Sequence, residues 1–170
     1  IVEFSDFECG YCRRNHELLK DLIGRRPGEV RVVYRHFPLD PACNEALDTD
    51  MHRRACRAAE AAECAARQSR FSEMADALFA NQRSLYDRRI FALAQELGLD
   101  AGDFQDCMNK GLTLGAVIED ARLGNKLGIN STPTLFINGR QVTGTFESAV
   151  GYDLAVLIET RLAARASHQQ

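Results

Sequence analysis

Long apolar runs and blocks of like charge are both missing from this sequence of 170 residues. No stretch approaches the roughly 20 apolar residues that span a bilayer, and no charged-then-apolar segment with a cleavage site stands at the front. Acidic and basic residues alternate along the chain and sum to a net charge of -3, so no basic block exists that would track phosphates. We therefore expect a soluble chain with no nucleic acid partner.

An initiating methionine is also absent, because the chain begins Ile1-Val2-Glu3-Phe4. We interpret the sequence as a piece cut from a longer precursor, with a removed signal, an anchor or a fused segment as the alternatives. Its length and its 45% hydrophobic side chains suit one domain with an adequate core.

The first quarter of the sequence predicts strand, helix and strand. Residues 1–7 alternate like a short strand, and an amphipathic helix follows Cys12 until Gly24. The β-branched and aromatic run Val30–Phe37 then stops at Pro38, which is typical of a second strand.

The middle of the sequence lacks any convincing strand. From about residue 45 to residue 127 its periodicity is helical and predicts four or five helices, with breaks near residues 81–87, 98–101 and 111. After this block, residues 133–143 predict a hairpin around Asn138-Gly139, because this pair supplies the positive φ angles of a type I′ turn. A last helix is expected over residues 148–164.

The order βαβ, helical block, ββα resembles an α/β thioredoxin fold that carries an inserted all-helical subdomain. Neither half supplies a complete four-stranded sheet alone. We therefore expect a single domain over residues 1–170, with the helical insertion at about residues 42–127.

One pair of cysteines has the spacing of a redox centre. A thiol attacks disulfides only as the thiolate, and the unpaired N–H groups at a helix start favour that form. Cys9 lies at this position, after a strand, and is expected to be the attacking sulfur. Cys12 lies one turn further along the helix and is expected to be the resolving thiol, which releases the substrate from a mixed disulfide.

The Cys9–Cys12 pair has two other interpretations. CxxC is also half of a zinc site, but a zinc knuckle has a second pair nearby and this sequence has no second CxxC. A purely structural bridge is the other alternative. We expect redox chemistry with no metal and no cofactor.

Two segments carry a more specific resemblance. Phe4-Ser5-Asp6-Phe7-Glu8-Cys9-Gly10-Tyr11-Cys12, together with Ser131-Thr132-Pro133-Thr134-Leu135-Phe136-Ile137-Asn138-Gly139, resembles the DsbA-like thioredoxin family. Phe37-Pro38-Leu39-Asp40, followed by Cys43-Asn44 and by residues 52–68, is similar to DsbA-like domains associated with, or fused to, vitamin K epoxide reductase-like membrane proteins. The resemblance implies that Pro133 is cis and faces the Cys9 sulfur, while the backbone of Thr132 pairs with an extended substrate. A plain strand start at Thr132-Pro133 is the alternative.

Glu3 is the one acid on the otherwise apolar first strand. If Val2 and Phe4 face one layer, strand alternation places Glu3 on the other. The family has a buried carboxylate here that relays protons to the resolving cysteine, and a raised pKa would suit Glu3 to deprotonate Cys12. The alternative is an exposed carboxylate paired with Arg31 or Arg35.

The residues between the two cysteines are Gly10 and Tyr11, so the histidine of strongly oxidising family members is missing. With Thr132 before the proline, Gly10 and Tyr11 are expected to face the substrate. This dipeptide looks more like that of disulfide isomerases, which leaves the net direction of reaction open.

Four further cysteines favour an oxidising compartment. Cys56 and Cys64 lie eight residues apart in one predicted helix, about 12 Å, whereas a disulfide needs less than about 7 Å between Cα atoms. Our first choice is a bridge between Cys43 and Cys56, and a bridge involving Cys64 or Cys107 is the second. Buried free thiols are favoured at Cys64 and Cys107. A metal site of Cys43, His52 and Cys56 is a further alternative.

These expectations combine into a protein thiol-disulfide oxidoreductase, with a dithiol oxidase favoured over an isomerase or reductase. Its expected partners are reduced or unfolded secreted proteins and a membrane reoxidase of the vitamin K epoxide reductase-like type. Its expected location is the periplasm or the extracytoplasmic face of the membrane. A non-catalytic module that binds peptide or metal is the rival from another class.

Overall fold

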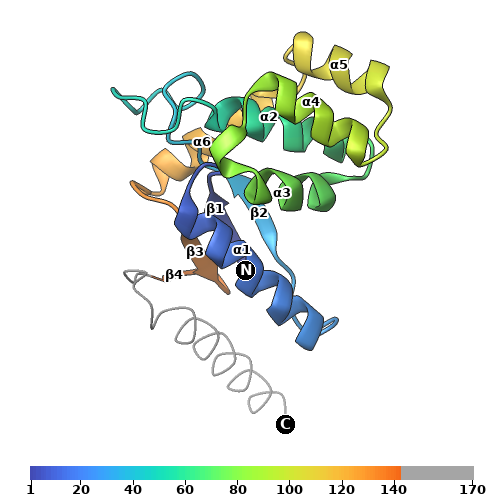
Figure 1. The fold of residues 1–170 in the computed structure, drawn as a ribbon. Coiled ribbons are helices and arrows are strands. Elements are labelled where there is room, and N and C mark those ends of the chain that lie inside the picture. The colour runs from blue at the N-terminus through green and yellow to red at the C-terminus, as the bar shows by residue number, and fades with distance from the viewer. Residues whose placement is uncertain (143–170) are drawn as a thin grey trace.

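The computed structural model describes residues 1–142. Alternating side chains build four short strands, and helical periodicity builds the rest (Figure 1). The strands are β1 (Val2–Ser5), β2 (Val33–His36), β3 (Thr134–Ile137) and β4 (Arg140–Val142). The helices are α1 (Gly10–Arg25), α2 (Ala55–Ala66), α3 (Phe71–Ala80), the 3-10 turn η1 (Gln82–Ser84), α4 (Asp87–Glu96), α5 (Ala101–Asn109) and α6 (Leu114–Lys126). The helix expected over residues 148–164 lies outside the described residues.

The two ends of the described chain form a single sheet, with strand order β2-β1-β3-β4. β1 pairs in parallel with β2 and antiparallel with β3, and β4 lies antiparallel to β3. Asn138 and Gly139 in the β3–β4 turn have φ angles of 50° and 79°, as the predicted type I′ turn requires. The second strand is shorter than predicted, because Val30 and Val32 pack beside Leu19 and Leu22 without joining the sheet ladder.

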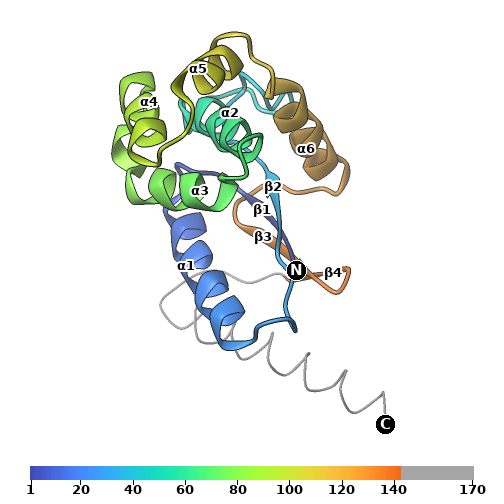
Figure 2. The same cartoon turned by 90° about the vertical axis from the view of Figure 1, so that its right-hand side faces the viewer.

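Helices cover both faces of the sheet (Figure 2). On one face, Leu19 and Leu22 of α1 pack with Leu135 and Ile137 of β3. On the other, α6 approaches so closely that a Cβ on Gly124 would lie 2.4 Å from the ring of Phe37. Only glycine fits at this position. Helix α6 follows the helical block in sequence, but it packs against the sheet on the face opposite α1.

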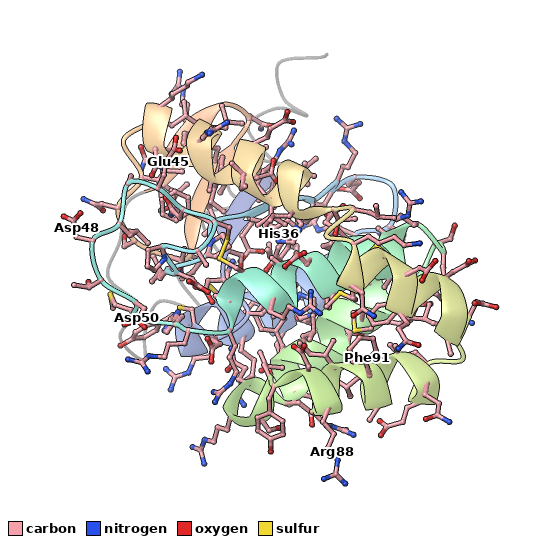
Figure 3. The ribbon with its side chains drawn as sticks, turned by 90° about the horizontal axis from the view of Figure 1, so that it is seen from above. His36, Glu45, Asp48, Asp50, Arg88 and Phe91 are labelled. Atoms are coloured by element: carbon pink, nitrogen blue, oxygen red, sulfur yellow. A yellow bond between two sulfur atoms is a disulfide. The ribbon has the colours of Figure 1, made fainter. Side chains whose placement is uncertain are left out.

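Helices α2 to α5 lie beyond one end of the sheet (Figure 1). α2 is buried along most of its length and is joined to β2 by Nε2 of His36, which lies 2.9 Å from Oε1 of Glu63. Figure 3 shows His36 near the middle of the molecule, close to α2. Within residues 1–142, no helix is both long and apolar enough to cross a membrane.

Two disulfides staple the helical block. The predicted bridge between Cys43 and Cys56 is confirmed, with Cα atoms 5.8 Å apart. The expectation of free buried thiols at Cys64 and Cys107 is wrong, because these residues form a second disulfide that joins α2 to α5. They lie 43 residues apart, and only helix packing brings their Cα atoms to 5.9 Å.

The first disulfide also removes the alternative metal site of Cys43, His52 and Cys56. Two of its three ligands are cysteine sulfurs that are bonded to each other, so they cannot bind a metal as thiolates. In the described part of the chain, no group of three or more His, Cys, Asp or Glu side chains is arranged to hold a metal ion.

Candidate active site

The predicted redox pair lies where β1 leads into α1. β1 ends at Ser5, and the amide of Cys9 donates to the carbonyl of Asp6 at 3.1 Å, which closes a turn before the helix. Cys9 has extended backbone angles and is the N-cap residue of α1, while Cys12 lies in the first turn. The unpaired amides of a helix start therefore surround the Cys9 sulfur.

The two thiols differ in access to solvent. Both are free, but Cys9 is 6% exposed and Cys12 has no exposed surface. The amide of Asp6 donates to the Cys12 sulfur at 3.4 Å. Only Cys9 can therefore meet an external disulfide or thiol without rearrangement, as expected for the attacking residue.

The two thiols also differ in acidity. A hydrogen bond from Cys12, the side chain of Thr132 and the amides of Cys12 and Tyr11 lower the pKa of Cys9 to about 6, against the opposing effect of burial. Burial, and then the proximity of Cys9 and the charge of Glu3, raises the pKa of Cys12 well above its ordinary value. Cys9 is thus a thiolate at neutral pH and Cys12 a protonated thiol, which is the division of labour of a nucleophile and a resolving group.

The backbone carbonyl of Thr132 lies next to the Cys9 sulfur, although 123 residues separate Thr132 from Cys9. The Thr132–Pro133 peptide bond is cis, as the family resemblance implied. The Cys9 thiol donates to the backbone carbonyl of Thr132 at 3.4 Å, and the buried Thr132 hydroxyl has no hydrogen-bond partner within residues 1–142.

Gly10 and Tyr11 occupy the first turn of α1. Gly10 is exposed, and a Cβ on it would meet no atom within 4 Å. Tyr11 is 48% exposed, and the guanidinium carbon of Arg14 lies 5.8 Å from its ring centre. Both residues therefore lie on the surface, directly after Cys9 in the chain.

Glu3 is buried, so the alternative of an exposed carboxylate paired with Arg31 or Arg35 is wrong. On β1 it lies between Tyr34 and Leu135 of the flanking strands, on the face covered by α1. Nδ2 of Asn15 donates to Oε1 of Glu3 at 2.8 Å. Arg35 instead pairs with Asp120 at 2.7 Å.

The surroundings of Glu3 make it a group that titrates near neutrality. Burial raises the pKa of Glu3 to about 7, in spite of hydrogen bonds from Asn15 and Ser5 that favour the charged form. Its charge in turn contributes to the raised pKa of Cys12. The carboxyl group is therefore electrically coupled to the resolving thiol, on which its expected proton transfer would act.

Sequence reasoning missed three residues that hold the site. Asn15 could have been found, because Cys12, Asn15, Leu19 and Leu22 share the helical spacing of one buried face. Gln82 of η1 donates to the carbonyls of Phe7 at 2.6 Å and Cys9 at 2.9 Å. No local sequence pattern predicts this contact.

The third missed residue is Asp6, which lies at the centre of a network. Its carboxylate accepts hydrogen bonds from the amides of Glu8 and Leu39, both at 2.7 Å, and lies 2.9 Å from Nδ1 of His52. Leu39 and His52 come from distant parts of the chain, so only the folded structure reveals their contact with Asp6.

Comparisons with known proteins agree with this geometry. A family model described as thioredoxin matches residues 1–151. The thioredoxin-like oxidoreductase from Silicibacter pomeroyi DSS-3 has a similar structure, with a TM-score of 0.72 and 29% identity over 94% of this chain and 85% of that one. BdbD from Bacillus subtilis shares the fold, with a TM-score of 0.75 and 20% identity over 95% of this chain and 86% of that one.

Curated relatives carry a different kind of name. The chain is 36% identical over 146 residues to Na(+)/H(+) antiporter NhaA 3 of Salinispora tropica, and 35% identical over 151 residues to Na(+)/H(+) antiporter NhaA 1 of Mycolicibacterium gilvum. These matches cover 86% and 88% of this chain but only 21% and 23% of those proteins. Because the thioredoxin model covers far more than half of the sequence, the chain belongs to the thioredoxin family.

Proposed function

We propose that this chain is a thiol-disulfide oxidoreductase that transfers its Cys9–Cys12 disulfide to reduced proteins outside the cytoplasm. The observation that carries the proposal is the contrast within the pair: Cys9 is the more accessible thiol with a pKa of about 6, and Cys12 is fully buried with a raised pKa. The contact between the Cys9 thiol and the carbonyl of Thr132, 3.4 Å apart, supports it.

The reaction runs in two exchanges. A substrate thiolate attacks the Cys9 sulfur, which breaks the Cys9–Cys12 bond, forms a mixed disulfide and releases Cys12 as a thiolate that takes up a proton. A second substrate thiolate attacks the sulfur bonded to Cys9, and Cys9 leaves as a thiolate. Two electrons pass from the substrate dithiol to the pair, and the substrate gains one disulfide.

Glu3 is proposed to move the proton of the buried thiol. In the oxidising direction its carboxyl group gives a proton to the leaving Cys12 thiolate, and in the reducing direction its carboxylate takes that proton back. A pKa of about 7 suits both tasks at neutral pH, because the group is then present in both forms.

The lowered pKa of Cys9 favours the oxidase direction. A stabilised thiolate stabilises the reduced enzyme and makes its disulfide a stronger oxidant. The isomerase or reductase alternative uses the same residues and requires a more reducing pair. Regeneration of the disulfide needs an external acceptor, which we propose is a membrane oxidoreductase of the vitamin K epoxide reductase-like type.

We also propose where in the cell this activity takes place. Two disulfides in the helical block suit the periplasm or the extracytoplasmic face of a membrane. The antiporter relatives favour a thioredoxin domain joined to a membrane transporter. An antibody against this domain would then detect, in the membrane fraction of the source cells, a polypeptide much larger than 19.0 kDa. A soluble 19 kDa band alone would contradict that setting.

The catalytic proposal is tested by substitution and trapping. The oxidised protein should oxidise a model dithiol peptide, Cys9→Ser should reduce this activity to background, and Cys12→Ala should accumulate mixed disulfides through Cys9. Full activity in Cys9→Ser would overturn the enzyme proposal and favour the peptide- or metal-binding alternative. Equilibration of the pair with glutathione gives its potential, and a value as reducing as about -270 mV would favour the reductase direction.

A further inference from the structure

The reactive thiolate lacks a cation within its own motif, because Gly10 and Tyr11 separate the cysteines. The fold brings an imidazole to the same region from the loop before α2. Nδ1 of His52 lies 2.9 Å from Oδ2 of Asp6, with the Asp6 side chain fully buried and that of His52 22% exposed. This pair joins the helical block to the segment that leads into Cys9.

Asp6 contacts both members of the redox pair through its backbone. Its carbonyl accepts a hydrogen bond from the amide of Cys9 at 3.1 Å, and its amide donates to the Cys12 sulfur at 3.4 Å. A side chain bound to the Asp6 carboxylate is therefore attached to the residue whose backbone contacts both cysteines.

His52 is also fixed by its own backbone. Its amide donates to the carbonyl of Leu39 at 3.1 Å, and the amide of Leu39 donates to the carboxylate of Asp6. Two residues later, the amide of Arg54 donates to Oε2 of Glu8 at 2.7 Å. The loop is thus bound to the segment before α1 at two places, through His52 to Asp6 and through Arg54 to Glu8.

We propose that His52, oriented by Asp6, is the cationic partner that stabilises the Cys9 thiolate. His52 is a positioning and electrostatic residue in this proposal, which rests on the proposed thiol-disulfide exchange at Cys9. It takes the place of the histidine missing between the cysteines, but it comes from a different part of the chain, which links the insertion to the reactivity of the core.

The charges around His52 support this role. Its hydrogen bond with Asp6, and then the charges of Asp6, Cys9 and Glu8, raise the pKa of His52 in spite of partial burial. On its own loop, Arg53 pairs with Asp50 at 2.8 Å, and Arg54 lies over the ring of Tyr86. Figure 3 shows Asp50 at the outer edge of this loop.

The sign of the coupling gives a pH window. Above about pH 6 Cys9 is a thiolate, and below the raised pKa of His52 the imidazole is a cation. Between these two values the groups attract each other. When the pH rises above the pKa of His52, the attraction is lost and the reduced form of the pair is stabilised less.

The direct test is the titration of His52 by NMR in the reduced and the oxidised protein. Because oxidation removes the Cys9 charge, we expect the pKa of His52 to fall by about 0.5 to 1 unit on oxidation. His16, which forms a similar pair with Asp76 at 2.6 Å, is the internal reference in the same spectra. Identical titration of His52 in both redox states would overturn the proposal.

Variants supply the reciprocal test. The pH at which Cys9 reaches half of its maximal alkylation rate should rise by about 0.5 to 1 unit in His52→Gln and stay near its original value in His52→Lys, which keeps a cation. His16→Gln should leave this pH unchanged. An unchanged profile in His52→Gln contradicts the proposal. If that variant does not fold, the NMR titration of the unmodified protein decides.

These measurements separate the inference from the proposed function. They report the ionisation of His52 and Cys9 and need no substrate protein. If no dithiol peptide is oxidised while the titrations shift as expected, the proposed function fails and the His52–Cys9 coupling stands. If the dithiol peptide is oxidised but neither titration shifts, the proposed function stands and the His52–Cys9 coupling is wrong.

Discussion

The cysteines of this protein fall into two regions that use the same side chain differently. At the start of α1, Cys9 and Cys12 are free thiols whose pKa values are shifted in opposite directions. In the helical block, Cys64 and Cys107 are buried and bonded to each other across two packed helices. Their locations, and not their residue type, separate the reactive pair from the structural one.

The physical cause is what surrounds each sulfur. Cys9 has helix-start amides, the Cys12 thiol and Thr132 around it, and all of them favour negative charge. Cys64 belongs to the same apolar cluster as Cys9 and Cys12, but it lies near the end of α2, away from any helix start, and is bonded to Cys107. Changes in the first region should therefore alter reactivity, and changes in the second should alter stability.

Removal of the disulfides is expected to have the largest effect on stability. In the chain-entropy description, loss of Cys64–Cys107, with 43 residues of separation, costs about 4 kcal/mol, and loss of Cys43–Cys56, with 13, costs about 3 kcal/mol. Urea unfolding of the two double Cys→Ala variants measures both values. The pH of half-maximal Cys9 alkylation should stay near 6 in each variant. A large shift of that pH would show that the two disulfides also affect the reactivity of Cys9.

Glu3→Gln is expected to change how stability depends on pH in the redox region. The pKa of Glu3 is about 7 in the folded protein against an ordinary value of 4.5, so the folded state binds the proton more tightly. Its contribution to the free energy of unfolding therefore falls as pH rises from 4.5 to 7, by about 2 to 3 kcal/mol. Between pH 4 and pH 8, the free energy of unfolding of Glu3→Gln should therefore rise by that amount relative to that of the unmodified protein.

The Glu3 measurement uses the oxidised protein, in which Cys9 and Cys12 do not titrate. Glu45→Gln serves as a control, because this exposed carboxylate has a lowered pKa caused by its hydrogen bond with Arg122, so any trend should be small and of opposite sign. If the free energy of unfolding depends on pH in the same way in the unmodified protein and in Glu3→Gln, the pKa of Glu3 is not raised by folding.

Gly124→Ala is expected to have the smallest effect of the three, at the joint between the helical block and the sheet. The added Cβ would lie 2.4 Å and 2.6 Å from two atoms of the Phe37 ring, and relief of this clash should cost about 2 kcal/mol. In the same helix, Gly115→Ala meets no atom within 4 Å and should stabilise the protein by up to about 1 kcal/mol. Thermal unfolding of both variants checks the pair, and equal effects would contradict close packing at Gly124.

The sequence predicted most of the local structure and the central chemistry. The CxxC after a strand located Cys9 and Cys12, strand alternation placed Glu3 opposite Phe4, and Asn138-Gly139 located the hairpin. Each of these rests on neighbours within a few residues, so a short window of sequence contains the relevant physics. The bridge between Cys43 and Cys56 could also be predicted, because only 13 residues separate the two cysteines.

The errors and omissions concern contacts between distant segments. The Cys64–Cys107 bridge depends on how α2 packs against α5, and Asp6 meets His52 only because the loop before α2 returns to the start of α1. Residue identity at these positions is compatible with several environments. Burial and pairing are decided by the packing of helices, which periodicity does not specify.

The sequence by itself thus determined which residues could do redox chemistry and in which elements they lie, because helix starts, strand parity and turn residues act locally. Only the tertiary structure decided how reactive they are. The acidity of Cys9, the burial of Glu3 and the approach of Thr132 depend on segments up to 123 residues apart. Their electrostatic effects act through space, and the distances involved exist only in the folded chain.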